Sequence, residues 1–321
     1  MFLVFLIILT AATAAYSQSL ERVRFTWETR YDNIESGRAE NRLEAALRLN
    51  FTINLFEDIK LINLLSSGSR FTSRWETIRN FNDPSKFRTF KLNLRQLYLQ
   101  RDFSWGRVQL GAIPPVKGKV SSTGLASNGW IDGGRIVYEL PWASVEFLAG
   151  SKADFNQPNL FEREMVMNFT ETELNFTPSD NFKGEFSFEK LNEETYLRSE
   201  AGYTFMPGKR DELVLTAEGL HNTGTKKWSY GLTLATDPLV HIHSSLAGYV
   251  TMIAYYNYTD EKIGLRGELT DDFYVFGHSL TLEFEGPITA DGKISWFFKP
   301  IIAEEERFNL GVEISLSIDN K

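Results

Sequence analysis

The chain has 321 residues, of which 42% are hydrophobic and 24% charged, a composition typical of a folded protein of one or two domains. It contains no cysteine, which excludes a disulfide scaffold, a thiolate metal site and a cysteine nucleophile. The formal net charge of −8 argues against a protein that binds nucleic-acid duplexes, because such a protein needs a basic surface.

The first residues have the features of an export signal. Residues 2–9 form an unbroken apolar run, and small residues follow through Ser17. The run is too short for a membrane-spanning helix, which needs about 20 apolar residues. We therefore predict a signal peptide over residues 1–17 and a single domain over residues 18–321, located outside the cytoplasm.

From residue 23 onward the dominant pattern is alternation with a period of two. In Leu43–Leu55 every odd residue is apolar, and most of the even residues are polar. Such alternation predicts strands with one apolar and one polar face. In chain order the predicted strands include Val23–Tyr31, Leu43–Leu55, Val108–Ile113, Arg135–Leu140, Leu197–Phe205, Leu213–Gly219, Trp228–Leu234, Ile263–Leu269, Phe276–Phe284, Ile294–Phe298 and Phe308–Ile318.

The connections between these strands alternate in length. Short ones lie near residues 57–58, 104 and 141, whereas long ones cover residues 72–86 and 118–129. Short turns at one end and long loops at the other are typical of an up-and-down barrel in an outer membrane. About seventeen such segments would enclose a lumen too wide for side chains to fill, so we expect the polar face to line water and the apolar face to meet lipid.

The number of strands must be even in a bacterial single-chain barrel. Residues 58–70 alternate worst, whereas residues 241–258 keep one apolar face and fit a single long strand. We therefore predict an all-β fold, a transmembrane up-and-down antiparallel β-barrel of about 16 strands, with 18 strands as the alternative.

One stretch, residues 94–138, combines three features. Leu94–Gln100 places an arginine among aliphatic and aromatic residues, Val108–Gly111 ends in Leu-Gly, and Asp132-Gly133 precedes the next strand. In this combination the stretch resembles substrate-selective outer-membrane porins of Gram-negative bacteria. The C-terminus departs from that family, because the last strand is followed by Asp319-Asn320-Lys321 and does not end on an aromatic residue.

The resemblance implies a passive channel for small hydrophilic solutes in the cell outer membrane. The partners it implies are the lipid bilayer, lipopolysaccharide and the solutes themselves, and it allows a homotrimer. It gives no role to nucleic acid.

Charge is divided unevenly along the chain, with a balance of +5 in residues 1–150 and −13 in residues 151–321. Sequence order is angular order around a closed barrel, so we predict a basic and an acidic wall that face each other across the lumen. By alternation, the pore-lining basic residues are Arg24, Arg48, Arg95, Arg107 and Arg135. The pore-lining acidic residues are Glu185, Glu200, Glu218, Glu268, Glu283 and Glu313.

These arginines favour a weak preference for anions, because guanidinium groups are permanently charged and bind carboxylates and phosphates. The alternative is that they are solvated residues with no selective role. The connection over residues 118–130 is rich in glycine and small polar residues, and we expect it to fold inward and constrict the pore. Its candidate residues are Lys119, Ser121, Thr123 and Asn128.

The second hypothesis is a secreted or periplasmic soluble β-rich protein that binds carbohydrate or hydrolyses it. Glu283 and Glu285 would then be candidate catalytic carboxylates, although they lie on one strand. His241 and His243 share a face but have no third ligand nearby, so we expect no metal and no cofactor. With four histidines and no Gly-x-Ser-x-Gly motif, we do not expect an enzyme.

Overall fold

The computed structural model describes residues 19–35, 38–56, 58–83, 85, 90–115, 117–118, 123–152, 155–209, 212–270, 276–304 and 306–319. The predicted signal peptide over residues 1–17 lies outside this part of the chain and stays a prediction. Among the described residues, no helix is long and apolar enough to cross a bilayer.

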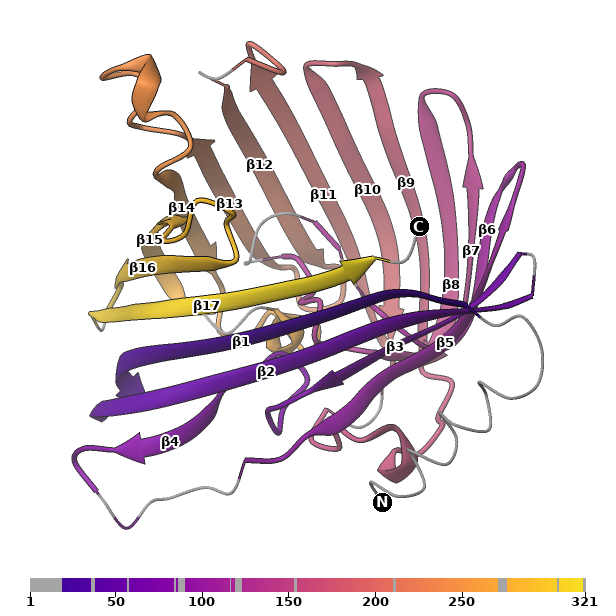
Figure 1. Cartoon of the computed structure of the whole chain (residues 1–321). Helices are drawn as coiled ribbons and strands as arrows, with labels where there is room; N and C mark the ends of the chain where they lie inside the picture. The colour runs from indigo at the N-terminus through magenta and orange to yellow at the C-terminus, as the bar shows by residue number, and fades with distance from the viewer. Residues whose placement is uncertain are drawn as a thin grey trace.

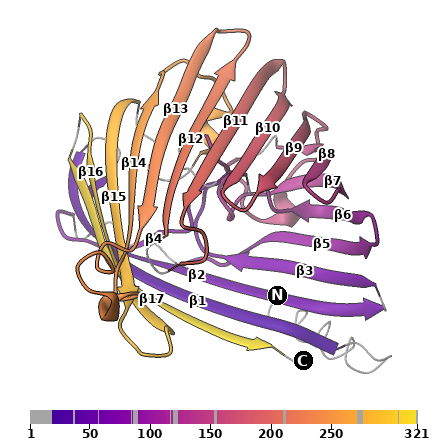
Figure 2. The same ribbon diagram turned by 90° about the horizontal axis from the view of Figure 1, so that it is seen from above.

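The described residues form one antiparallel sheet that closes on itself (Figures 1 and 2). Consecutive strands pair with each other, except that β4 pairs with β2 while β3 pairs with β5, and β1 also pairs with β17, which closes the barrel. The strands are β1 (Ser19–Glu35), β2 (Arg38–Phe56), β3 (Ile59–Ser66), β4 (Glu76–Asn80), β5 (Asn93–Phe103), β6 (Gly106–Ile113), β7 (Ile131–Glu139), β8 (Ala143–Ser151), β9 (Phe169–Ser179), β10 (Phe182–Leu191), β11 (Glu194–Phe205), β12 (Leu213–Asn222), β13 (Lys227–Thr236), β14 (Thr251–Thr259), β15 (Gly277–Pro287), β16 (Ile294–Ile302) and β17 (Arg307–Asp319). Three short 3-10 helices are η1 (Leu160–Glu162), η2 (Ser244–Leu246) and η3 (Gly267–Leu269).

The short strand β4 explains why seventeen segments make a barrel of sixteen strands. β3 pairs with residues 48–56 of β2, and β4 pairs with residues 42–45 of the same strand. Between β3 and β4 the chain leaves the wall, and Phe71 is buried there. β3 and β4 are therefore one interrupted strand, and the predicted closed antiparallel barrel of 16 strands is confirmed. The poor alternation after residue 58 falls on β3 itself, because Ile62 and Leu64 are apolar although they face the interior.

Two segments predicted as strand are not strand. Residues 260–270, which include the predicted strand Ile263–Leu269, fold as turns and η3. Ile263 and Leu269 are buried among other loop residues, so their alternation reflects packing inside the barrel. Residues 237–250 form turns and η2, and β14 begins only at Thr251. The predicted single long strand over residues 241–258 is therefore a connection up to residue 250 and a strand only from Thr251 onward.

The outward face of the wall is apolar over most of its circumference. Exposed outward side chains include Leu110, Phe147, Phe188, Leu232 and Leu310. Aromatic pairs occupy both ends of the strands. Trp105 stacks on Phe103 with ring centroids 5.0 Å apart, at the end of the short turns. Trp228 stacks on His221 at 4.1 Å, at the end of the long loops. An apolar band between two aromatic girdles is the exterior of a membrane barrel.

Apolar side chains also gather inside the barrel, near the end of the long loops. The cluster joins residues of inward-turned connections to inward residues of the wall, and its members are Phe71, Tyr98, Ile113, Leu125, Trp130, Ile131, Leu148, Phe169, Leu191, Tyr196, Leu220, Ile263 and Leu269. Phe71 and Trp130 are packed with ring centroids 4.9 Å apart. Because these connections bury apolar side chains, they hold fixed positions inside the lumen. The polar side chains that they carry are therefore held in place as well.

Candidate functional site

The inward face of the barrel is polar, and one connection lies against it. We call residues 114–130 the inner loop, of which residues 114–115, 117–118 and 123–130 are described. It leaves β6 and returns to β7, and on the way it contacts the inward face from β5 to β12. The contacts are ionic on the side of β8 to β12 and are made to backbone carbonyls on the side of β5.

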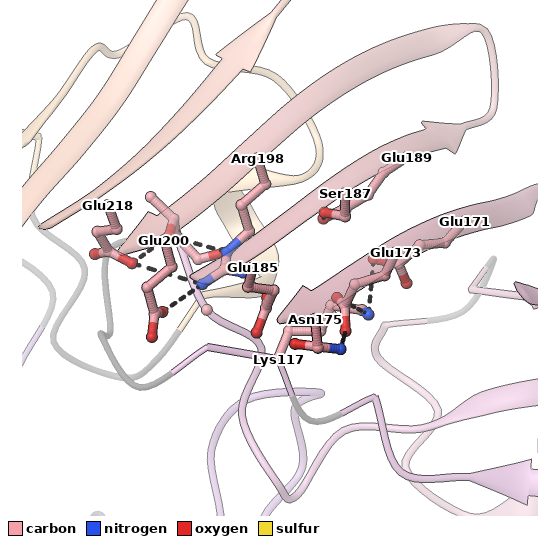
Figure 3. Close-up of polar contacts among 12 residues, drawn as sticks. Lys117, Glu171, Glu173, Asn175, Glu185, Ser187, Glu189, Arg198, Glu200 and Glu218 are labelled. Atoms are coloured by element: carbon pink, nitrogen blue, oxygen red, sulfur yellow. Dashed lines mark hydrogen bonds and ion pairs between the residues drawn. The ribbon is translucent and has the colours of Figure 1, made fainter. Parts of the chain in front are cut away.

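Lys117 fixes the first part of the inner loop to the acidic wall. Its ammonium group lies 2.9 Å from Glu171 and 3.6 Å from Glu146, and it also pairs with Glu173 (Figure 3). Burial alone would lower the pKa of this lysine, but the neighbouring carboxylates outweigh it and raise the pKa above its usual range. Lys117 is therefore always charged and neutralises part of the acidic wall.

Arg198 fixes the middle of the inner loop. Its guanidinium is fully buried and pairs with Glu185, with Glu200 at 2.7 Å and with Glu218 at 3.9 Å (Figure 3). Its Nε also donates to Thr123 of the inner loop, at 3.1 Å to Oγ1 and 3.2 Å to the carbonyl oxygen. One cation thus joins three carboxylates of the wall to the loop.

A second connection reaches the same point of the inner loop. We call residues 260–270 the second inner loop. Arg266 is fully buried, and its Nε donates to Glu189 at 2.6 Å. Its Nη2 donates to the carbonyl oxygen of Thr123 at 2.7 Å. The two inner loops are therefore held together by a guanidinium that is itself paired with β10.

Arg95 points inward, as predicted, but it cannot line an open pore. It is 0% exposed, and its guanidinium donates to the carbonyl oxygens of Ser67 and Ser73 at 2.7 Å and of Arg70 at 2.8 Å. Because its hydrogen bonds are made to loop carbonyls, this arginine holds the chain between β3 and β4 in the interior. Arg135 is also buried, paired with Glu146 at 2.7 Å.

A cavity of about 590 Å³ lies below the inner loop, towards the end of the short turns. It is lined by Arg107, Lys183 and the carboxylates of Glu146, Glu173, Glu185 and Glu200, among other residues. Each of these four carboxylates has a cation partner in Lys117, Arg135 or Arg198. Among the described residues, no ion pair involves Arg107 or Lys183. Arg107 and Lys183 are therefore cations of this lining that no carboxylate of the described residues holds.

The remaining predicted wall residues lie on β1, β2, β15 and β17. Arg24 is exposed on the inward face, opposite Asn50 and Ser317 in register. Glu283 pairs with Lys299 at 3.0 Å. Glu313 stands opposite Glu28 of β1, because closure of the barrel brings the last strand beside the first. The prediction that Glu313 faces the basic wall across the lumen is therefore wrong.

Five predicted residues belong to connections. Thr123 and Asn128 are buried inside the barrel, where Thr123 hydrogen-bonds Glu218 and the Asn128 carbonyl accepts from Arg95 at 3.3 Å. Lys119 and Ser121 lie outside the described residues. Glu268 was predicted on a strand, but its backbone belongs to η3, so it is not part of a strand wall.

Sequence reasoning missed the residues that fix the inner loops. Arg198 could have been found, since it alternates with Glu200 on a predicted strand and must share its inward face. Lys117 and Lys152 lie in connections without periodicity, so the sequence gives no direction for their side chains. Arg266 lies in the predicted strand Ile263–Leu269, on the same alternate face as Glu268, but its partners could not be predicted because this segment is not a strand.

Lys152 is a buried charged residue of the interior, next to the end of β8. Its side chain is buried, no described residue forms a hydrogen bond with its amine, and Nζ lies 3.6 Å from the ring centroid of Phe169. Burial, together with the charge of Arg266, lowers its pKa to about 7. Glu189 and Glu171 oppose this shift, and Lys117 adds to it.

The stability of the barrel is therefore expected to depend on pH through Lys152. The folded pKa is about 7 and the unfolded value is 10.5, so the unfolded chain binds the extra proton and stability rises with pH through this window. Between pH 6 and pH 8 the wild type should gain about 1.4 kcal/mol more than Lys152→Met. Denaturant titrations at both pH values measure this difference.

Lys183→Met is the control, because it removes a lysine that lines open water. Its pH dependence should match that of the wild type. Equal gains in the wild type and in Lys152→Met would show that the buried amine does not titrate in this range.

Comparisons with known proteins identify the fold. No family model and no curated protein matches the sequence. Among solved structures, the chain is similar to OccK5 (OpdH) of Pseudomonas aeruginosa, with 11% identity over 93% of this chain and 98% of that one and a TM-score of 0.56. It is similar to OprB of Pseudomonas putida, with 10% identity over 97% and 95% and a TM-score of 0.58. A variant of the Rh. blastica porin matches with 11% identity over 94% and 100% and a TM-score of 0.58.

These similarities cover nearly the whole length of each chain. The chain therefore has the fold of a porin-type β-barrel with 16 strands. At 10–11% identity the neighbours show the fold alone, so what the barrel conducts must be argued from its own residues.

Proposed function

We propose that this protein is an outer-membrane porin through which small hydrophilic solutes diffuse passively, with a weak preference for anions. The observation that carries the proposal is that the exterior of the barrel is apolar and its interior is charged, the reverse of a soluble barrel. Exposed outward residues such as Leu232 and Leu310 need lipid, whereas inward residues such as Arg24 and Arg107 need water.

The alternative of a soluble β-rich hydrolase or carbohydrate-binding protein requires an exterior that water can solvate. The outward band of exposed leucine and phenylalanine would cause such a protein to aggregate. The solved structures with this fold are channels rather than enzymes, which is indirect support for a channel. Recovery of the mature chain in the soluble periplasm, without detergent, would overturn the proposal.

The anion preference rests on which lumen charges are already paired. The carboxylates that line the cavity below the inner loop are all bound by cations. Arg107 and Lys183 line the same cavity and take part in no ion pair among the described residues. Local charges at the narrow part of a channel set its selectivity, so these two unpaired cations favour anions even though the whole chain carries −8.

The test is the reversal potential of the protein in a planar bilayer across a salt gradient. The double variant Arg107→Gln, Lys183→Gln should lower the ratio of anion to cation permeability by roughly twofold or more. The matched control is Arg101→Gln, Lys190→Gln, which removes two cations from the outward face. An unchanged reversal potential in the lumen variant would show that these groups are merely solvated. Absence of any conductance in the wild type would contradict the porin function itself.

A further inference from the structure

Lys152 is a cation that the proposed channel does not use, because it is 1% exposed and does not line the cavity below the inner loop. It follows the last residue of β8. Charged groups of four other elements face it. They are Glu171 of β9, Glu189 of β10, Arg266 of the second inner loop and Lys117 of the inner loop.

Both carboxylates that face Lys152 are held by other cations. Glu171 lies 2.9 Å from the amine of Lys117, and Glu189 accepts a hydrogen bond from Arg266 at 2.6 Å. No described residue forms a hydrogen bond or an ion pair with the Lys152 amine. A proton on this amine would therefore add a buried positive charge without a counter-ion, which is costly in the interior of a protein. The docked second inner loop thus fits a neutral amine.

Of the two loops that face Lys152, the second inner loop is the less firmly held. The inner loop is fixed by Lys117 and Arg198, each of which pairs with three carboxylates. The second inner loop has one buried ion pair among the described residues, between Arg266 and Glu189. Movement of this loop therefore breaks fewer ionic contacts than movement of the inner loop, and it would let water reach the amine.

We propose that protonation of Lys152 releases the second inner loop from the interior of the barrel and so widens the lumen. The loop buries Ile263 and Leu269 in the apolar cluster inside the barrel, the same cluster that contains Phe169 beside the Lys152 amine. Its release therefore clears part of the lumen and hydrates the new charge. The effect on conductance rests on the proposed porin function, whereas the movement of the loop does not.

Proton linkage gives the sign and the pH range of the effect. In the docked state the pKa of Lys152 is about 7, because burial and the charge of Arg266 disfavour the charged amine. In the released state water surrounds the amine, and its pKa returns to 10.5. Only the released state binds the proton between these values, so release becomes easier as the pH falls towards 7. The ratio of released to docked protein should rise about fiftyfold from pH 9 to pH 7, but only about twofold from pH 7 to pH 5.

The test is the rate at which a buried cysteine on the second inner loop reacts with a water-soluble thiosulfonate, in the full-length protein in lipid vesicles. The chain has no cysteine, and Thr270, the last residue of this loop, is 2% exposed. In Thr270→Cys the thiol reacts only when the loop is released, so the rate follows the released fraction. Glu261→Cys is exposed on the same loop, and division by its rate removes the pH dependence of the thiol itself. The corrected rate should follow the profile given above.

Two variants in the Thr270→Cys background assign the profile to Lys152. Lys152→Met should abolish the rise between pH 9 and pH 7, because methionine fills a similar space without an ionisable group. Lys183→Met, which removes a lysine of the cavity lining, should keep it. A histidine switch would give the opposite profile, flat above about pH 7.5 and rising below it, since histidine titrates near 6.5. That profile, or a rise that persists in Lys152→Met, would overturn the proposal. If Lys152→Met does not fold, the shape of the profile in the chain that keeps Lys152 still decides.

Single-channel conductance is measured over the same pH range on the chain without introduced cysteines, and it should rise from pH 9 to pH 7. Reactivity that follows the profile in a protein without conductance contradicts the porin function and leaves the loop movement standing. Conductance together with a flat corrected rate supports the porin function and overturns this inference.

Discussion

Arg198→Met is expected to lower the free energy of unfolding by about 3–5 kcal/mol, because removing one partner of a buried ion pair leaves uncompensated charge. Here three carboxylates, Glu185, Glu200 and Glu218, would remain close together without their shared cation. The inner loop would also lose the hydrogen bonds from Arg198 to Thr123. Equilibrium unfolding in lipid vesicles measures the first effect, and single-channel conductance measures the release of the loop.

Lys183→Met is the control for Arg198→Met, since it removes a lumen cation that lines open water and should cost less than about 1 kcal/mol. A second variant isolates the cause. Adding Glu218→Gln to Arg198→Met should recover part of the lost stability, because fewer like charges then face one another. If Arg198→Met proved as mild as Lys183→Met, the guanidinium would not be what holds the inner loop in place.

The strands of the barrel could be predicted because each one has a single apolar face. In Leu43–Leu55 and in Phe308–Ile318 the residues alternate because one face of the strand meets lipid and the other does not. The strands β2 and β17 contain these two segments. The interruption between β3 and β4 could not be predicted, because the lost alternation after residue 58 falls on β3, whose apolar Ile62 and Leu64 face the interior. Phe71 packs against Trp130 inside the barrel, a contact between residues far apart in the chain.

The interior could not be predicted to the same degree. Alternation predicts which face of the sheet a residue lies on, but not whether a loop covers that face. The prediction that Arg95 points into the barrel is therefore correct, whereas the prediction that it lines an open pore is wrong, because its side chain is buried. Residues 263–269 mimic a strand because their apolar side chains pack into the loop cluster. Glu313 was misplaced for a different reason, since closure places the end of the sequence beside its beginning.

The orientation of the wall itself can be tested on two adjacent residues of β2. Leu49 stands opposite Phe25 of β1 and Leu65 of β3, on the apolar outward face. Asn50 stands opposite Arg24 and Leu64, on the inward face, where its amide donates to the carbonyl of Asn63 at 3.5 Å. Both residues lie near the middle of the alternating segment Leu43–Leu55, so they differ in the direction of their side chains and hardly in depth.

Leu49→Arg is therefore expected to destabilise the barrel by about 2–4 kcal/mol, the cost of placing an arginine in the middle of the bilayer on the lipid face. Asn50→Arg introduces the same charge one residue away, yet it should cost less than about 1 kcal/mol, since water screens its repulsion from Arg24. Unfolding titrations in vesicles compare the two variants directly.

Spin labels at the same positions provide an independent readout. Oxygen dissolved in lipid should relax a label at residue 49, and a water-soluble paramagnetic complex should relax a label at residue 50. The reverse accessibility would mean that the polar face meets lipid, and neither a water-filled lumen nor a porin would then be compatible with this wall.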